Sequence, residues 1–296
     1  MSRLSISVAI PVFNGEKYIE QAIRSAMEQT LPPQEIIVID DGSTDSSREI
    51  ASSFGPSVTC ISQQNRGLSA ARNLAVKRSS GDWIAFLDAD DYWFPDKLAR
   101  QAAVIQADPS IGLIYTGKTN LFPDGTTNDE PVRQPSWIKK MLPVQNFIFP
   151  TTVMVKRSLV LEHAFDETLK SSEEWWFFYS LSRITDFGVI ADPTAVYRLS
   201  QESLSNRDWK SVLHYADIVS QRILHDFTGF HKMLLRRKVN SRLFASAALS
   251  ARVHGSPEFL SYIVKSLVSW PIPDFWSARY KIFLKMLFQK INTMRV

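Results

Sequence analysis

The chain has 296 residues, of which 45% are hydrophobic and 22% charged, a composition typical of a globular protein with a sizeable core. Its single cysteine, Cys60, excludes an internal disulfide and a cluster of cysteine metal ligands. No run of about 18 or more apolar residues occurs, so we expect no membrane-spanning helix. The N-terminal stretch is a poor match to a signal peptide, and we therefore expect a cytoplasmic protein.

The net charge of +4 is unevenly distributed along the chain. Residues 206–296 hold 15 Lys or Arg and 5 Asp or Glu, a balance of +10, which leaves −6 for residues 1–205. Such an asymmetry indicates that the two parts of the chain have different partners.

Roughly the first 100 residues alternate between predicted strands and predicted helices. The strands are apolar runs rich in β-branched residues, at 6–13, 35–40, 58–62 and 83–88. The intervening helices are expected at 16–30, 43–54 and 67–80. In the second of these, Ser46 and Glu49 are spaced as a capping box. Continuous apolar strands that alternate with helices predict a parallel sheet covered on both faces.

Three of these strands end in polar signatures: "PVFNG", "DDGSTD" and "DADD". Ligands bind beyond the carboxyl ends of the strands in open sheets of this kind, so the three signatures should gather at one edge. The carboxylates of Asp88, Asp90 and Asp91 resist joint ionisation at this spacing. Capping of the next helix would explain one of them, Asp91, but does not require three acids. A divalent cation explains the cluster, because Mg²⁺ and Mn²⁺ favour carboxylate ligands alongside substrate phosphates.

Beyond Asp96 the sequence predicts a helix at 96–108, a strand at 111–119 and a loop at 122–135. Short helices and strands are predicted up to residue 205, and mostly helices from Trp209 onward. The stretch "GLIYTGKT" at 112–119 fits the P-loop pattern letter for letter. Its middle residues favour a strand, and the following "NLFPDGTT" cannot begin a helix. We therefore reject a P-loop here.

Four segments stand in order along the chain: "IPVFNGEKYIEQAIRSAMEQT", "IIVIDDGSTDSS", "NRGLSAARNLA" and "FLDADDYWFPDKL". In these segments and their spacing the chain resembles inverting family 2 glycosyltransferases of the GT-A fold. The resemblance implies an α/β fold with a mostly parallel central sheet flanked by helices. It places a donor half at about 1–110 and an acceptor half at about 111–205 of a catalytic domain. A basic helical region, 206–296, would follow.

The resemblance also assigns donor-side roles to matching positions. Pro11, Val12 and Phe13 correspond to the wall of the nucleotide-base pocket, and Asp41 to the residue that recognises the base. Arg72 is expected to order the donor pocket, with a salt bridge within the fold as the alternative.

The acids at the strand end receive roles from the same resemblance. Asp88 is expected to face the ribose or the donor sugar, and Asp90 to bind Mn²⁺ or Mg²⁺. Asp40 is expected to be structural. These roles suit glycosyl transfer, because a cation stabilises the charge that develops on the leaving diphosphate.

The attacking hydroxyl needs a base, and "SSEEWWFF" supplies the candidates. Relatives carry Glu-Asp before Trp at this position, with the second acid as base. Here the pair is Glu173 and Glu174, which leaves the choice between them open. The alternative is that both acids merely favour the dipole of a helix start. Trp175 and Trp176 are candidates for an acceptor-sugar platform, although at least one is expected in the core.

The sequence lacks the Gln-x-x-Arg-Trp motif of processive synthases. We therefore expect a nonprocessive, metal-dependent enzyme that moves one sugar from a UDP-sugar to a glycan or lipid-linked acceptor, with no nucleic-acid partner. A sugar-phosphate nucleotidyltransferase and a catalytically silent binding or scaffold protein are the alternatives.

The C-terminal segment "FWSARYKIFLKMLFQKI" has an amphipathic pattern. Its apolar positions at helical spacing are Trp276, Tyr280, Phe283, Leu284, Leu287 and Ile291. Together with the excess positive charge, this pattern predicts peripheral binding to an anionic inner-membrane surface. Packing against the protein itself or against a second subunit is the alternative.

Overall fold

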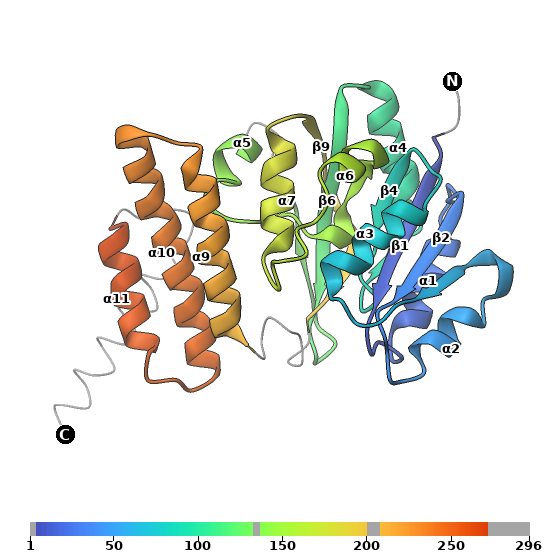
Figure 1. Ribbon diagram of the computed structural model, residues 1–296, viewed down its shortest axis with the longest axis horizontal. Coiled ribbons are helices and arrows are strands. Elements are labelled where there is room, and N and C mark those ends of the chain that lie inside the picture. The colour runs from blue at the N-terminus through green and yellow to red at the C-terminus, as the bar shows by residue number, and fades with distance from the viewer. Residues whose placement is uncertain (1–3, 133–136, 200–207, 272–296) are drawn as a thin grey trace. The chain divides into compact units, whose positions relative to one another are not determined.

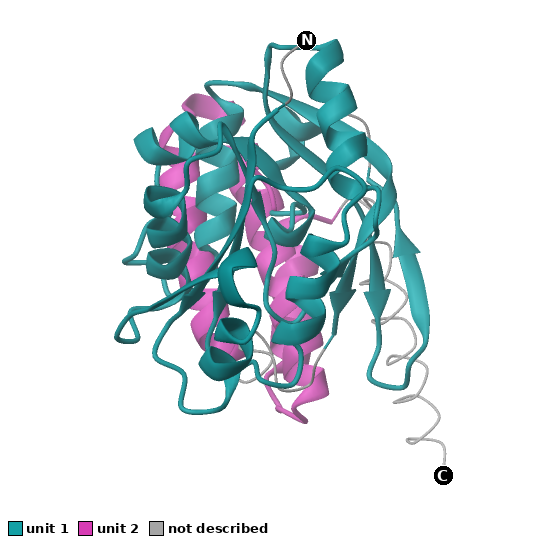
Figure 2. Ribbon diagram, turned by 90° about the vertical axis from the view of Figure 1, so that its right-hand side faces the viewer, with its two compact units in different colours: residues 1–142, 146–203 teal, residues 143–145, 204–296 magenta. Residues whose placement is uncertain are grey.

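A computed structural model describes residues 4–132, 137–199 and 208–271 of the chain (Figure 1). The chain divides into two compact units (Figure 2). The first comprises residues 1–142 and 146–203, and the second comprises 143–145 and 204–296.

The first unit contains a sheet in which four strands run parallel. Their order is β3 (Thr59–Ser62), β2 (Glu35–Asp40), β1 (Ile6–Val12) and β4 (Trp83–Phe86). The connections contain α1 (Ile19–Met27), α2 (Ser47–Ser52), the 3₁₀ turn η1 (Gly55–Ser57) and α3 (Leu68–Arg78). Every residue of β1 is buried, as expected for a parallel strand with both faces covered. The predicted alternation of strands and helices is therefore confirmed.

The rest of the sheet is mixed. Strand β8 (Met154–Lys156) pairs antiparallel with β4 and with β6 (Ile111–Leu121), and β9 (Asp186–Arg198) runs parallel to β6. Strand β5 (Tyr92–Trp93) pairs antiparallel with β9. Residues 112–119 lie inside the buried strand β6, which confirms that they form no P-loop.

The predicted loop at 122–135 is corrected by the structure, which has a strand there, β7 (Thr127–Glu130). All four residues of β7 are exposed, so the strand carries no apolar pattern that the sequence could reveal. Side-chain pairs hold it to β6: Lys118 Nζ lies 2.8 Å from Glu130, and Thr119 Oγ1 donates to Asp129 over 2.6 Å.

The capping box predicted at Ser46 and Glu49 is wrong. Ser46 occupies the N-cap of α2, but its side chain makes no capping hydrogen bond. Asp45 takes over this role, because its Oδ1 accepts hydrogen bonds from both the backbone N–H and the hydroxyl of Ser47.

Helices and turns complete the first unit around this sheet (Figure 1). They are α4 (Lys97–Ala107), α5 (Ile138–Met141), the 3₁₀ turn η3 (Pro150–Thr152), α6 (Arg157–Glu162) and α7 (Glu173–Ser182).

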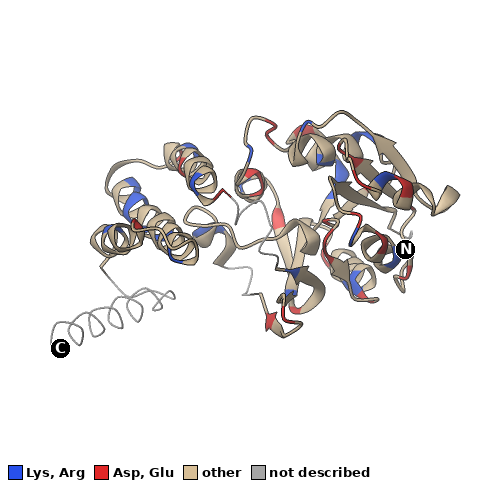
Figure 3. Cartoon of the chain, turned by 90° about the horizontal axis from the view of Figure 1, so that it is seen from below, with Lys and Arg blue, Asp and Glu red and all other residues tan. Residues whose placement is uncertain are grey.

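The second unit consists, in its described part, of α9 (Trp209–His225), α10 (Gly229–Val253) and α11 (Phe259–Ser269). Trp209 packs with the small residues Ala247 and Ala251 of α10. Ser241 and Ser266 join α10 to α11 by reciprocal hydrogen bonds to each other's backbone carbonyl. Figure 3 marks in blue the positions of Lys and Arg along these helices.

No helix among the described residues has the length and hydropathy needed to cross a membrane. The amphipathic segment predicted at 276–291 lies outside the described residues.

Candidate active site

Asp88, Asp90 and Asp91 lie between the end of β4 and the start of β5. Asp91 is 1% exposed, and its Oδ1 accepts a hydrogen bond from the backbone N–H of Arg198 over 2.9 Å. It is not a helix cap, since Asp96 occupies the N-cap of α4. The capping alternative for Asp91 is therefore wrong.

The three carboxylates affect one another's ionisation. Burial and the charges of Asp90 and Asp88 raise the pKa of Asp91 well above its usual value. Desolvation and the charge of Asp88 raise the pKa of Asp90 to about 6, although its side chain reaches solvent. The cluster thus carries more negative charge than its surroundings accommodate, and a bound cation would relieve it.

The donor set decides what kind of cation site is possible. Among residues 4–132, 137–199 and 208–271, no three His, Cys, Asp or Glu side chains are grouped so that they could hold a metal ion by themselves. Asp90 is accessible, while Asp91 Oδ2 is buried without a hydrogen-bond partner. One or two carboxylates completed by phosphate oxygens suit Mg²⁺ or Mn²⁺. The residues present therefore fit a cation held jointly with a phosphate-bearing ligand.

The segment between β4 and β5 that carries Asp88, Asp90 and Asp91 is called the acidic loop below. Arg72 connects this loop to the start of α7. Its side chain is 2% exposed; Nη2 donates to Asp88 Oδ1 over 2.7 Å and Nη1 to Glu173 Oε1 over 3.1 Å. Burial alone opposes the charge, but Asp88 and Glu173 raise the pKa of Arg72 above its usual value. The guanidinium therefore stays charged and links two elements that are far apart in the sequence.

The two glutamates at the start of α7 lie in different environments. Glu173 is buried against Arg72, whereas Glu174 is partly exposed. Burial and the charge of Glu173 raise the pKa of Glu174 to about 8, against the opposing effect of Arg72. Glu173 is thus engaged in an ion pair with Arg72, while the pKa of Glu174 lies well above its usual value.

The two tryptophans that follow also differ. Trp175 is buried, and its Nε1 donates to the carbonyl of Leu142 over 2.7 Å, which places it in the core. Trp176 is partly exposed and remains the candidate for acceptor contact.

The residues expected to form the nucleotide side of the site begin at the end of β1. Pro11 and Val12 are buried, while the next residue, Phe13, is 52% exposed. Asp41 is buried and accepts hydrogen bonds from the backbone N–H groups of Arg66 and Gly67 over 2.9 and 2.8 Å. Its contacts thus fix the loop that leads into α3, and recognition of a base by Asp41 stays a prediction.

The structure adds three residues that the sequence did not single out: Thr151, Tyr197 and Arg198. Thr151 Oγ1 accepts a hydrogen bond from the backbone N–H of Asp88 over 3.3 Å. Burial, followed by the charges of the acidic loop and Glu174, raises the pKa of Tyr197. Arg198 Nε donates to the carbonyl of Asp90 over 2.9 Å. The segments "FPTT" and "YRLS" carry no periodicity or charge pattern that would have shown this placement.

Comparison with known proteins gives one family match and several relatives. Residues 7–204 match the model of "Glycosyl transferase family 2". The putative teichuronic acid biosynthesis glycosyltransferase TuaG of Bacillus subtilis is 30% identical over 213 residues, covering 70% of this chain and 83% of TuaG. Chondroitin synthase of Escherichia coli is 29% identical over 185 residues, 62% of this chain, but the match spans only 27% of that protein.

Solved structures of similar fold carry nucleotide ligands. Residues 1–349 of TarS from S. aureus, in complex with UDP, give a TM-score of 0.63 at 21% identity, covering 90% of this chain and 81% of that one. The mannosyltransferase PcManGT from Pyrobaculum calidifontis, in complex with GDP-Man and Mn²⁺, gives 0.62 at 17% identity, covering 97% and 81%. These similarities confirm the expected fold.

Proposed function

Because the chain belongs to glycosyltransferase family 2, we propose that it moves one sugar from a UDP-sugar to an acceptor hydroxyl in a metal-dependent, inverting reaction. The observation that supports this best is the ion-pair network of Arg72, which joins Asp88 at the donor side to Glu173 at the start of α7. The buried guanidinium of Arg72 thereby holds the acidic loop in a fixed position relative to the start of α7, which carries the candidate base Glu174.

The chain's own residues would divide the work. Asp90 would hold Mn²⁺ or Mg²⁺ together with the donor diphosphate, and the cation would supply Lewis-acid stabilisation of the departing charge. Asp88, oriented by Arg72, would face the donor sugar. Glu174 would accept the proton of the acceptor hydroxyl, because a base is most effective when its pKa lies near the working pH. Direct attack opposite the leaving group inverts the donor carbon.

The acceptor class is proposed from the relatives. TuaG is named for teichuronic acid biosynthesis, and the chain also matches part of chondroitin synthases. A growing surface polysaccharide or a lipid-linked glycan is therefore the acceptor we propose. The basic second unit would hold the enzyme at the anionic membrane surface where such intermediates lie.

Thermal unfolding with UDP, GDP and their sugar derivatives, each with and without Mn²⁺, tests the donor and the metal. A ligand that binds only the folded protein raises its melting temperature, so UDP with Mn²⁺ should do so and UDP alone much less. Asp90→Asn should abolish the Mn²⁺-dependent part of the shift. Its own melting temperature should equal or exceed that of the wild type, because the Asp90 side chain is exposed and its charge lies beside that of Asp88.

The matched control is Asp217→Asn, the same change at an exposed position of α9 in the second unit. It should leave the UDP shift unaltered. A shift of equal size for Asp90→Asn and wild type would contradict the metal assignment. A rise in melting temperature with GDP but not with UDP would contradict the choice of UDP. Donor binding without sugar transfer to any acceptor glycan would favour the silent-binding alternative.

A further inference from the structure

Lys97, at the first position of α4, is a completely buried lysine. Its Nζ donates to Gln101 Oε1 over 2.8 Å and lies 4.1 Å from the centroid of the Trp93 ring. Within the described part of the chain, no carboxylate forms an ion pair with it. Burial lowers the pKa of Lys97 well below its usual value.

Stability does not explain a lysine at this position. An ammonium group taken out of water without a carboxylate partner is costly, and a packed apolar side chain of similar length is often at least as stable. Its immediate neighbours, a tryptophan ring and a side-chain amide, compensate only in part.

The ammonium fixes the orientation of both neighbours. As an ammonium group, Lys97 only donates hydrogen bonds, so the carbonyl oxygen of Gln101 faces it and the amide Nε2 points away. That Nε2 donates to the carbonyl of Thr152 over 3.0 Å. The Trp93 ring lies against the ammonium, and its Nε1 donates to the carbonyl of Thr151 over 2.8 Å. Both connections therefore end on consecutive carbonyls of the η3 turn.

The η3 turn in turn holds the acidic loop. Thr151 Oγ1 accepts a hydrogen bond from the backbone N–H of Asp88, and the carbonyl of Asp88 accepts one from the backbone N–H of Asp91 over 3.0 Å. We propose that Lys97 is a positioning residue that fixes the η3 turn, and through it Asp88 and Asp91, in the geometry needed to bind the donor diphosphate and its cation. This inference rests on the function proposed above for that loop.

The test compares Lys97→Met with Lys156→Met in the full-length protein. Lys156 on β8 is a suitable control, because its Nζ also lies near a tryptophan ring, Trp83 at 5.7 Å, and donates to the carbonyl of Pro109. Calorimetry gives the Kd of UDP with Mn²⁺, and urea unfolding gives the stability midpoint. For Lys97→Met the Kd should rise about 10- to 100-fold, the range for residues that support a metal site from outside its ligand shell, with the midpoint unchanged or higher. Lys156→Met should keep the wild-type Kd.

Trp93→Phe provides a second, independent variant should Lys97→Met fail to fold. It keeps a ring beside the ammonium but removes the hydrogen bond to Thr151. Its Kd should rise as well. Wild-type Kd in either folded variant, or a lowered midpoint with unchanged Kd, would overturn the inference and leave Lys97 a structural residue. Absence of Mn²⁺-dependent UDP binding by the wild type would instead overturn the proposed function itself, and the inference with it.

Discussion

At the scale of single residues, the ionisation of the carboxylates depends on how the buried guanidinium of Arg72 is shared among them. Arg72 contacts Asp88 and Glu173 directly, but Glu174 only through its more distant field. One positive charge cannot neutralise three carboxylates in a poorly solvated region, so the one without a direct contact keeps its proton most readily. Glu174 is that group, and its environment suits an exchangeable proton.

Glu174→Gln should lower turnover by about 10²–10⁴-fold, the usual contribution of a positioned base, while the Kd of UDP stays near that of the wild type. Glu173→Gln should instead lower the free energy of unfolding by about 3 kcal/mol, because it removes a buried partner of Arg72. Turnover and urea unfolding of both variants separate the two roles. If Glu173→Gln alone lost turnover with full stability, the base would move by one residue.

The pKa of Glu174 predicts two pH effects. Turnover should rise with pH and level off above about pH 8, because the base acts only when ionised. The folded protein also binds this proton more tightly than the unfolded chain does. The resulting contribution to stability is complete below the ordinary pKa of 4.5 and is lost as pH rises through about 8.

Glu174→Gln should remove this part of the pH dependence of stability. Urea unfolding without metal at about pH 5 and about pH 9 measures the difference, with the wild type as reference. An identical loss of stability between the two pH values in both proteins would show that Glu174 has an ordinary pKa.

At the scale of elements, the sequence predicts the parallel half of the sheet well because burial on both faces gives β1, β2 and β4 continuous apolar runs. It also locates the acidic strand end, since the carboxylates begin at Asp88, two positions after the last residue of β4. The later strands are defined by their pairing with other strands of the sheet and not by an apolar pattern of their own. Strand β7 is wholly exposed, and β9 pairs with β5, a strand that is far from it in the sequence.

The same reason limits prediction of the site. The difference between Glu173 and Glu174 arises from Arg72, which lies 101 positions before Glu173 in the chain. Thr151 and Arg198 reach the acidic loop through η3 and β9. No local pattern in the sequence predicts these contacts. The residue types therefore suggest the chemistry of the site but not which residue performs which step.

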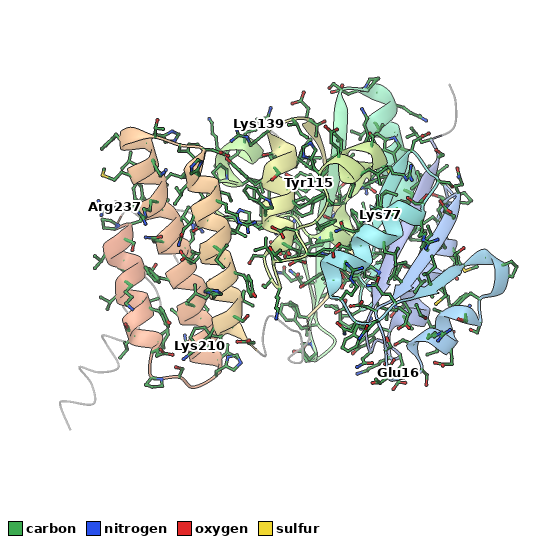
Figure 4. The ribbon with its side chains drawn as sticks, in the orientation of Figure 1. Glu16, Lys77, Tyr115, Lys139, Lys210 and Arg237 are labelled. Atoms are coloured by element: carbon green, nitrogen blue, oxygen red, sulfur yellow. The ribbon has the colours of Figure 1, made fainter. Side chains whose placement is uncertain are left out.

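Asp45 shows how an element boundary can be tested. Its Oδ1 accepts from Ser47 at the start of α2, and its Oδ2 accepts from the backbone N–H of Glu16, which is labelled in Figure 4. Asp45→Ala should therefore lower the free energy of unfolding by about 1–2 kcal/mol, the upper range for a helix cap. Ser46→Ala, the matched control one residue later, should change it by less than about 0.5 kcal/mol. Urea unfolding measures both, and a larger loss for Ser46→Ala would restore the capping box.

At the scale of the whole molecule, the charge divides between the two parts of the chain. Residues 206–296 carry a balance of +10 and residues 1–205 one of −6. In the second unit, α10 exposes the apolar side chains of Phe230 and Met233 near Arg236 in the sequence. Basic and apolar side chains on one helix are typical of contact with an anionic bilayer surface.

The full-length protein should therefore bind vesicles that contain phosphatidylglycerol, and salt should weaken the binding. The test pair is Lys232→Glu with Arg236→Glu on α10, and each lost positive charge should weaken binding by about 1 kcal/mol or more. Arg237, labelled in Figure 4, is left intact because its guanidinium donates to the carbonyls of Ser269 and Val268.

The matched control is Lys77→Glu with Arg78→Glu, the same change in charge at exposed positions of α3 in the first unit (Figure 4). Since both pairs alter the net charge equally, only a localised membrane contact predicts that the α10 pair weakens vesicle flotation more. Equal weakening by the two pairs would show a response to net charge alone. Failure of the wild type to float with anionic vesicles at low salt would remove the membrane partner, and the basic unit would then have to serve the acceptor or a second protein.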